Sequence, residues 1–235
     1  MNRKPTWNHI DSTSMELSGD LGWINKPINT NEYLLVSWRM AGSEFVRESI
    51  LENFTYVVGN KKWGKTHAIL DDEIADILIK SGTKIIMVIS DPREIATNVK
   101  FFDNGLHFID TDYHSDTNLG FTTIDQIAEK QINLMNFFKN KFKKNCLIVR
   151  YEDAVFFREK FLNKVSSFLD CTPLYKDNVE KYKKSSFKNV GHFQQFFPNS
   201  VLKRHRKKFI DFYEEWDYPV NGLAQLKYKW CVKGI

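Results

Sequence analysis

The sequence predicts a three-layer α/β domain in which helices flank a central parallel sheet. Apolar runs of strand length alternate along the chain with amphipathic segments that have helical spacing. This alternation is typical of a parallel sheet covered by helices on both faces. With 235 residues, of which 42% are hydrophobic, the chain has enough apolar material for one compact domain, and we expect residues 1–235 to form it.

Four apolar segments are the candidate strands of this sheet. They are Tyr33–Trp38, Phe54–Val58, Lys84–Ser90 and Cys146–Tyr151. Ligands of open α/β folds bind beyond the carboxyl ends of parallel strands. We therefore expect the first and third of these segments to lie near each other and to end at one ligand-facing edge.

Two apolar stripes with i, i+3, i+4, i+7 spacing predict helices, one from Ile124 to Phe138 and one from Phe157 to Leu169. Residues 1–30 are polar and rich in turn formers, so we expect them to run around the outside of the domain. Residues 103–122 are rich in Asp, Asn and Gly without helical spacing. A long loop of this kind inside a compact domain is either functional or a mobile surface segment.

The segment YLLVSWRMAGSEFVRESI, residues 33–50, has the order of a phosphate cradle. An apolar strand leads into a short turn with one glycine, and a helix begins at Ser43. Amides of a first helical turn, together with the helix dipole, can hold an anion. The segment lacks the G-x-x-x-x-G-K-[ST] pattern of a Walker A loop. Because α/β proteins also contain such turns without a ligand, the pattern alone leaves a structural interpretation open.

Four further motif segments follow along the chain. They are GKTHAI around Lys65, SDPRE at Ser90, VRYED ending at Asp153, and SSFKNVG from Ser185. With the cradle, they resemble the sulfotransferases that use 3′-phosphoadenosine 5′-phosphosulfate, PAPS. The family motifs are S/T-Y-P-K/R-S-G-S/T-T-W, K-T-H, R-D-P-R-D, V-x-Y-E-D and T-S-F. The resemblance covers residues 33–191, most of the chain, and implies a P-loop-like fold and sulfuryl transfer from PAPS to an acceptor hydroxyl or amine.

The K-T-H match implies the catalytic residues. It places His67 as the general base, and imidazole is the side chain that titrates near neutral pH. Lys65 would stabilise charge on the leaving oxygen or orient His67. Without the surrounding motifs, a histidine at a strand end and a solvated lysine would be the ordinary interpretations of these two residues.

The resemblance also implies the donor loop, with two departures. The basic residue of the family falls on Met40, and Arg39 stands where proline is usual. Arg39 could reach the phosphate as a bidentate donor if the turn is rearranged. Glu44 would repel the donor unless it turns away or pairs with a cation such as Arg47. The remaining loop positions of the family are matched by Ala41, Gly42, Ser43, Glu44 and Phe45.

The residues implied for the 3′-phosphate and the adenine come from later motifs. The arginine and serine of the family fall on Ser90 and Asn98, which can donate hydrogen bonds but carry no charge. Lys188 is the best source of the missing charge. Tyr151 would contact adenine and the ring of Phe187 would stack on it, with Ser186 beside Phe187 as a further donor-binding residue. Tyr151 is equally compatible with a core position at a strand end, and Arg93 matches a position that is more often structural.

The sequence gives less support to other classes of protein. The three cysteines and six histidines show no disulfide framework or metal-ligand spacing, so we expect PAPS as co-substrate and no metal. The N-terminus has no apolar h-region and no run could span a bilayer, so we expect a cytoplasmic protein. A net charge of +5 and the run Lys203–Lys208 raise nucleic-acid binding as a rival, but no nucleic-acid motif accompanies them.

Two alternatives to sulfuryl transfer remain at this point. One is a nucleotide-binding, kinase-like protein, although the Walker lysine and the Mg²⁺-binding Ser/Thr are missing. The other is a degenerate, inactive copy of the fold. For an active enzyme the acceptor would be a small molecule or glycan, with residues 103–122 as the candidate acceptor-binding loop.

Overall fold

The computed structural model describes residues 8–9, 32–38, 41–58, 63–66, 69–96, 113–116, 120–175, 193 and 197–218. They group into two compact units. The first comprises the described part of residues 1–89 and 133–177, and the second that of residues 90–132 and 178–235. The single domain predicted for residues 1–235 stays a prediction. No helix among the described residues is both long and apolar enough to cross a membrane.

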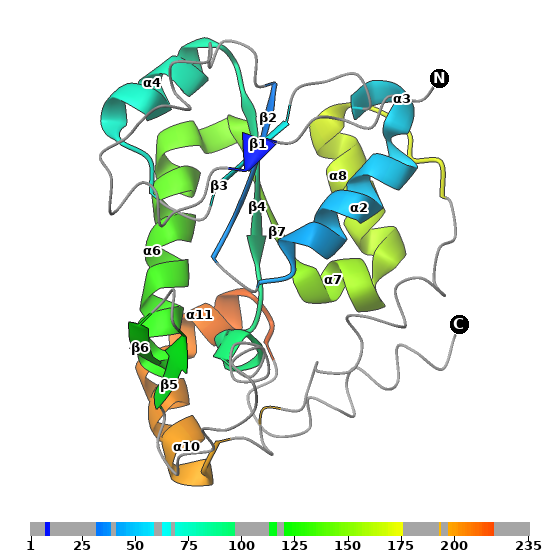
Figure 1. Cartoon of the computed structure of the whole chain (residues 1–235). Helices are drawn as coiled ribbons and strands as arrows, with labels where there is room; N and C mark the ends of the chain where they lie inside the picture. The colour runs from blue at the N-terminus through cyan, green and yellow to red at the C-terminus, as the bar shows by residue number, and fades with distance from the viewer. Residues whose placement is uncertain are drawn as a thin grey trace. The chain divides into compact units, whose positions relative to one another are not determined.

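The first unit is built on an all-parallel, five-stranded sheet with the order β1-β3-β2-β4-β7 (Figure 1). The strands are β1 (Asn8–His9), β2 (Tyr33–Ser37), β3 (Trp63–Thr66), β4 (Lys84–Ile89) and β7 (Cys146–Arg150). β2 and β4 are direct neighbours, with Leu35 opposite Ile86. The predicted proximity of these two strands is therefore confirmed.

Burial on both faces explains why β2 and β4 are apolar throughout. All five residues of β2 are buried, as are all residues of β4 except its first. A strand in the middle of a parallel sheet has no solvent-facing side, so its sequence does not alternate.

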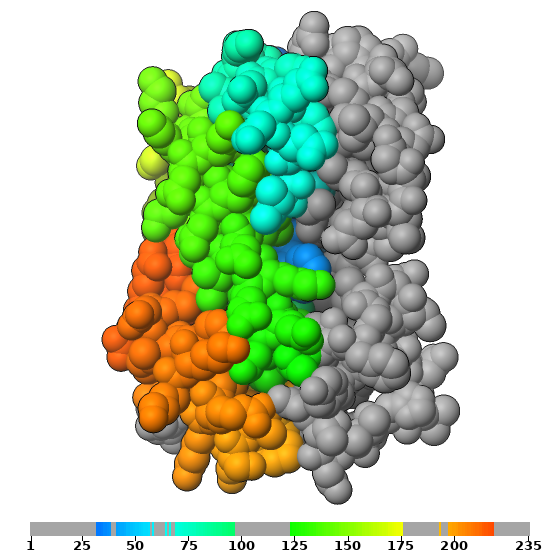
Figure 2. Space-filling view, turned by 90° about the vertical axis from the view of Figure 1, so that its left-hand side faces the viewer, coloured from blue at the N-terminus to red at the C-terminus, as the bar shows by residue number. Residues whose placement is uncertain are grey.

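Helices cover both faces of this sheet, which confirms the predicted three-layer α/β fold (Figure 1). On one face lie α2 (Ser43–Asn53), α7 (Tyr151–Phe156) and α8 (Arg158–Leu169). On the other lie α4 (Asp72–Lys80) and residues 133–142 of α6 (Ile124–Phe142). Figure 2 shows α4 and α6 side by side, and an ion pair of 2.9 Å joins Lys141 of α6 to Asp72 of α4.

The amphipathic stripes account for the two long helices. In α6 the apolar positions of the stripe are buried from Ile124 to Phe138. In α8 the buried positions are Phe161, Leu162, Val165 and Leu169, whereas Phe168 is partly exposed. A reciprocal pair of hydrogen bonds starts α6: the Gln126 amide donates to the Thr123 hydroxyl at 3.1 Å, and the Thr123 amide donates to the Gln126 side chain at 2.8 Å. This arrangement is a capping box.

One strand prediction was wrong. Residues 54–58 are not a strand, because Thr55–Val58 forms the one-turn helix α3. Phe54 and Val58 are both fully buried and lie one helical turn apart, while Thr55 and Tyr56 are exposed. Burial with a period of four residues therefore overrides the β-propensity of this run.

β3, which the sequence did not reveal as a strand, lies between β1 and β2. Its sequence, WGKT, is short and contains glycine and lysine, which strands disfavour. Within residues 1–30, which were expected to run around the outside of the domain, Asn8 and His9 pair with β3 at the edge of the sheet. The rest of residues 1–30 lies outside the described residues.

The second unit contains a short hairpin and two helices near the C-terminal end of the described chain. Its elements are β5 (Tyr113–Asp116), β6 (Gly120–Thr123), the first part of α6, α10 (Asn199–Lys208) and α11 (Ile210–Glu215). β5 and β6 pair antiparallel within the segment that was predicted as the loop 103–122. The other residues of that segment lie outside the described part of the chain, so its proposed role in acceptor binding stays a prediction.

Candidate functional site

The connections of the sheet reverse direction between β2 and β4. β2 continues through α2 to β3 on one side of the pair, and β4 continues through α6 to β7 on the other side. α2 and residues 133–142 of α6 lie on opposite faces of the sheet (Figure 1). In open α/β sheets such a switch point leaves a crevice beyond the carboxyl ends of the two strands, and this crevice is where ligands bind.

Four of the five predicted motif segments lie at or directly after the carboxyl end of one of four neighbouring strands. β2 ends at Ser37 before the cradle turn, β3 at Thr66 before His67, β4 at Ile89 before Ser90, and β7 at Arg150 before Tyr151. The strands are parallel and paired in register, for example Val36 with Thr66 and Ile89 with Arg150. Four motif segments that are distant in sequence therefore start from one edge of the sheet.

Gly42 shapes the turn between β2 and α2. It caps α2 with φ 78° and ψ 20°, in the left-handed region. The helical hydrogen-bond ladder starts with the Val46 amide, which donates to the Gly42 carbonyl at 3.2 Å. The amides of Ser43, Glu44 and Phe45 precede this first bond and form the N-terminal turn of an 11-residue helix. Such a turn carries the positive end of the helix dipole.

A side chain at position 42 is excluded by Tyr151 as well as by the backbone angle. A Cβ atom on Gly42 would lie 2.2 Å from Cδ2 and 2.6 Å from Cε2 of the Tyr151 ring. The same ring meets Phe45 edge to face, with centroids 5.6 Å apart. Tyr151 is therefore a buried aromatic residue at the first position of α7, packed directly against the cradle turn.

The carboxylate of Glu44 is paired rather than isolated. It forms an ion pair of 2.8 Å with Arg47 one helical turn later, and its side chain is 51% exposed. Arg47 also pairs with Glu48 at 2.5 Å. Pairing and solvent together reduce the repulsion that Glu44 would exert on an anion at the start of α2.

The remaining predicted residues fall into two groups. Lys65 lies in β3 with its backbone opposite Leu35, and nothing is described of its side chain. The others lie outside the described residues: Arg39, Met40, His67, Asn98, Ser186, Phe187 and Lys188. Their roles stay predictions.

Ser90 is buried, and its backbone is held by a residue that the sequence did not single out as functional. The Ser90 amide donates to Oε1 of Gln131 at 3.1 Å, and Nε2 of Gln131 donates to the Ser90 carbonyl at 2.7 Å. Gln131 is fully buried in α6. The sequence indicates this contact only through the position of Gln131, which is a polar residue within the otherwise apolar stripe of the helix.

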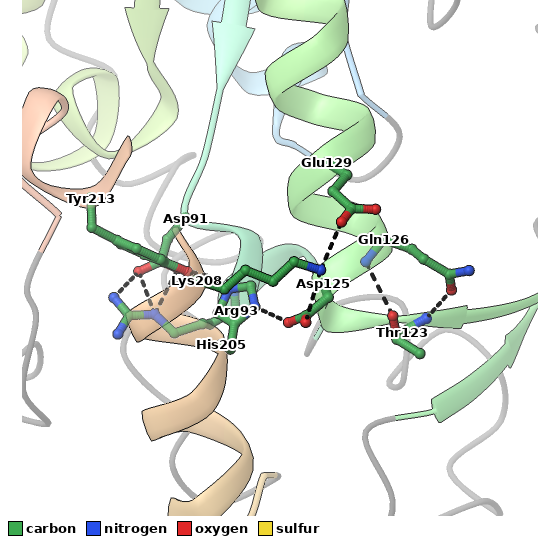
Figure 3. Close-up of polar contacts among 9 residues, drawn as sticks. All are labelled: Asp91, Arg93, Thr123, Asp125, Gln126, Glu129, His205, Lys208 and Tyr213. Carbon is green, nitrogen blue, oxygen red and sulfur yellow. Dashed lines mark hydrogen bonds and ion pairs between the residues drawn. The ribbon is translucent and has the colours of Figure 1, made fainter. Parts of the chain in front are cut away.

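Arg93 lies in a closed polar cluster of the second unit (Figure 3). Its guanidinium pairs with Asp91 at 2.5 Å and lies between two aromatic rings, 4.2 Å from the centroid of Phe193 and 4.5 Å from that of Tyr213. Burial alone would lower the pKa of Arg93, but the Asp91 carboxylate raises it above its usual value. With Arg93 only 2% exposed, this geometry fits a structural role.

A buried histidine joins three elements of the same unit. Nδ1 of His205 lies 2.6 Å from a carboxylate oxygen of Asp125, and Nε2 lies 2.8 Å from the Tyr213 hydroxyl (Figure 3). Burial lowers the pKa of His205, although Asp125 acts in the opposite direction. Burial likewise raises the pKa of Tyr213, as does the neighbouring Asp91 carboxylate.

The basic run Lys203–Lys208 is therefore not one continuous charged patch. It lies on α10, where His205 is fully buried and Lys208 pairs with Glu129 at 2.8 Å and with Asp125 at 3.4 Å. No group of three or more His, Cys, Asp or Glu residues within the described ranges is placed to hold a metal ion.

Comparison with solved structures identifies the fold. The chain is similar to the crystal structure of the mouse sulfotransferase SULT7A1 complexed with PAP, at 17% sequence identity and a TM-score of 0.56. The match covers 86% of this chain and 89% of that one. No protein-family model and no curated protein matches the sequence. At this identity the similarity shows that the chain has a sulfotransferase-like, P-loop-like fold.

Proposed function

We propose that the protein is a PAPS-dependent sulfotransferase. One observation carries this proposal. Four motif segments lie at the carboxyl ends of β2, β3, β4 and β7, along one edge of the sheet and around its topological switch point. The resemblance of these segments to the motifs of the family, in the same order, supports it. The PAP complex of the mouse sulfotransferase is consistent with a donor of this kind.

The donor's 5′-phosphate end would lie at the N-terminus of α2. In this arrangement the amides from Gly42 to Phe45 donate to phosphate oxygens, as helix N-termini do for many anions. Arg39 supplies the positive charge that the family's basic residue provides at the position of Met40. Further contacts of the donor come from the later motifs, and they involve Ser90, Asn98, Ser186, Phe187 and Lys188.

The reaction transfers SO₃ from the donor to an acceptor hydroxyl or amine. The acceptor oxygen or nitrogen forms a bond to sulfur while the bond from sulfur to the bridging oxygen of the 5′-phosphate breaks. That oxygen keeps the electron pair and leaves as part of adenosine 3′,5′-bisphosphate. His67 takes the proton of the acceptor, and Lys65 stabilises the charge on the leaving oxygen.

A thermal-shift screen tests the donor class. Adenosine 3′,5′-bisphosphate should stabilise the protein without Mg²⁺, and more strongly than ATP, GTP or AMP do. At one hundred times its dissociation constant, the ligand should add about 2.7 kcal/mol to the free energy of unfolding. Stabilisation by ATP that requires Mg²⁺ would instead identify a kinase-like protein.

One observation favours a second function, nucleotide binding without catalysis. The positions of two phosphate-binding cations of the family are occupied by Met40 and Ser90, neither of which is charged. A protein of this kind would bind adenosine 3′,5′-bisphosphate yet release none of it from PAPS with any member of an acceptor panel. Release of the bisphosphate that depends on an acceptor would exclude it.

A further inference from the structure

The ring of Tyr151 fills the space behind the turn that joins β2 to α2. Three of its atoms, Cδ2, Cε2 and Cγ, lie 2.2, 2.6 and 2.7 Å from the position of a Cβ on Gly42. Its edge-to-face contact with Phe45 reaches the third residue of α2, so one side chain contacts both the last residue of the turn and the first turn of the helix. At 6% exposure, Tyr151 is fixed in the core by its own burial.

This turn needs an external restraint because its own backbone is permissive. Glycine has access to more backbone conformations than any other residue and loses the most freedom when it is fixed in one of them. In the resembled family a proline precedes the turn, and proline restricts the backbone. Here that position holds Arg39, which imposes no such restriction. The ring of Tyr151 is the contact that blocks movement of Gly42 in its direction.

We propose that Tyr151 is a positioning residue that holds the Gly42 turn in the conformation that presents the amides at the start of α2 to the donor's 5′-phosphate. This inference rests on the proposed function of the turn as the phosphate site. It differs from a contact between Tyr151 and adenine, because a restraint on the turn affects every ligand with a 5′-phosphate. A base contact affects only ligands that contain adenine.

Two ligands separate these roles. Adenosine 3′,5′-bisphosphate contains both the base and the 5′-phosphate, whereas ribose 5-phosphate contains the 5′-phosphate without the base. Their dissociation constants would be measured by calorimetry for the wild-type chain, Tyr151→Leu and Tyr151→Phe. Phe138→Leu is the matched control, because Phe138 is fully buried and stacks on Phe142 in α6, away from Gly42.

Tyr151→Leu should weaken both ligands by a similar factor, about tenfold, because the turn must then be ordered at the moment of binding. Tyr151→Phe, which keeps the ring, should recover most of this loss for both ligands. Phe138→Leu should lower stability while leaving both dissociation constants within about twofold of the wild type.

The outcomes distinguish this inference from the proposed function. If Tyr151→Leu weakens the bisphosphate alone, or weakens neither ligand, the positioning role is refuted while the donor site stands. The same holds if the wild-type chain binds the bisphosphate but not ribose 5-phosphate. An equal loss of affinity in Phe138→Leu would show a general effect of destabilisation. A wild-type chain that binds neither ligand would overturn both proposals.

Discussion

Gly42→Ala should destabilise the protein through two separable effects. The first is conformational: alanine at a φ of 78° costs about 1–2 kcal/mol, because the Cβ atom crowds the backbone in the left-handed region. The second is steric: the new Cβ would lie 2.2 Å from the ring of the buried Tyr151, and overpacking of this kind costs about 1–3 kcal/mol. Together these effects predict a loss of about 2–5 kcal/mol.

Gly82→Ala isolates the first effect. Gly82 follows the end of α4 with a similar φ of 72°, but a Cβ there would meet nothing within 4 Å. Gly82→Ala should therefore cost about 1–2 kcal/mol, the conformational term alone. The difference between the two variants measures the collision with Tyr151.

Urea denaturation of both variants, followed by circular dichroism, gives the two free energies. In a Tyr151→Ala background the ring is absent, so Gly42→Ala and Gly82→Ala should then have equal costs. This cycle assigns the coupling to one pair of residues. Equal costs of the two glycine variants in the wild-type background would refute the packing of Tyr151 against the cradle turn.

Three further perturbations have defined outcomes. Arg93→Met should lower the free energy of unfolding by about 3–5 kcal/mol, because it removes the cation that pairs with the buried Asp91 carboxylate. Adding Asp91→Asn should recover part of this loss in urea denaturation. Additive losses of the two variants would contradict the ion pair. Burial lowers the pKa of His205, so the unfolded chain binds a proton there at a higher pH than the folded chain does. The free energy of unfolding should therefore be highest above about pH 6.5 and fall below it. The His205→Gln variant should lose this pH dependence, and an unchanged profile in the variant would contradict it. His67→Ala should reduce turnover by about 10²–10⁴-fold while changing the affinity for adenosine 3′,5′-bisphosphate by no more than a few-fold, and normal turnover with a verified acceptor would refute its role as base.

The central strands could be predicted because burial on both faces makes them apolar at every position. β2 and β4 have this property, and their predicted bounds differ from the observed ones by one residue. β3 could not be recognised in the same way, since it contains glycine and lysine and is held in the sheet by pairing on both sides. Pairing with distant segments has no local signature in the sequence.

The contacts that shape the candidate site were beyond prediction for the same reason. The pattern of residues 33–50 indicated the strand, the turn and the helix of the cradle, and the structure has all three. It did not indicate that Tyr151, more than a hundred residues later, fills the space that a side chain at Gly42 would need. The two hydrogen bonds between Gln131 and the backbone of Ser90 likewise join residues that are distant in sequence, so they could not be predicted from it.

The interpretation of the basic run on α10 illustrates how position decides the role of a charge. In the sequence, Lys203–Lys208 raises the possibility of a surface for nucleic acid. In the structure, its histidine is a fully buried partner of Asp125 and Tyr213. Only the fold could separate this residue from its exposed neighbours.

A crystal structure with adenosine 3′,5′-bisphosphate would show whether the donor binds at the cradle turn. The 5′-phosphate should lie at the N-terminus of α2, within hydrogen-bond distance of amides between Gly42 and Phe45, with His67 facing the side from which an acceptor would approach. A nucleotide bound elsewhere on the chain, or a His67 side chain buried far from the phosphate, would contradict this placement.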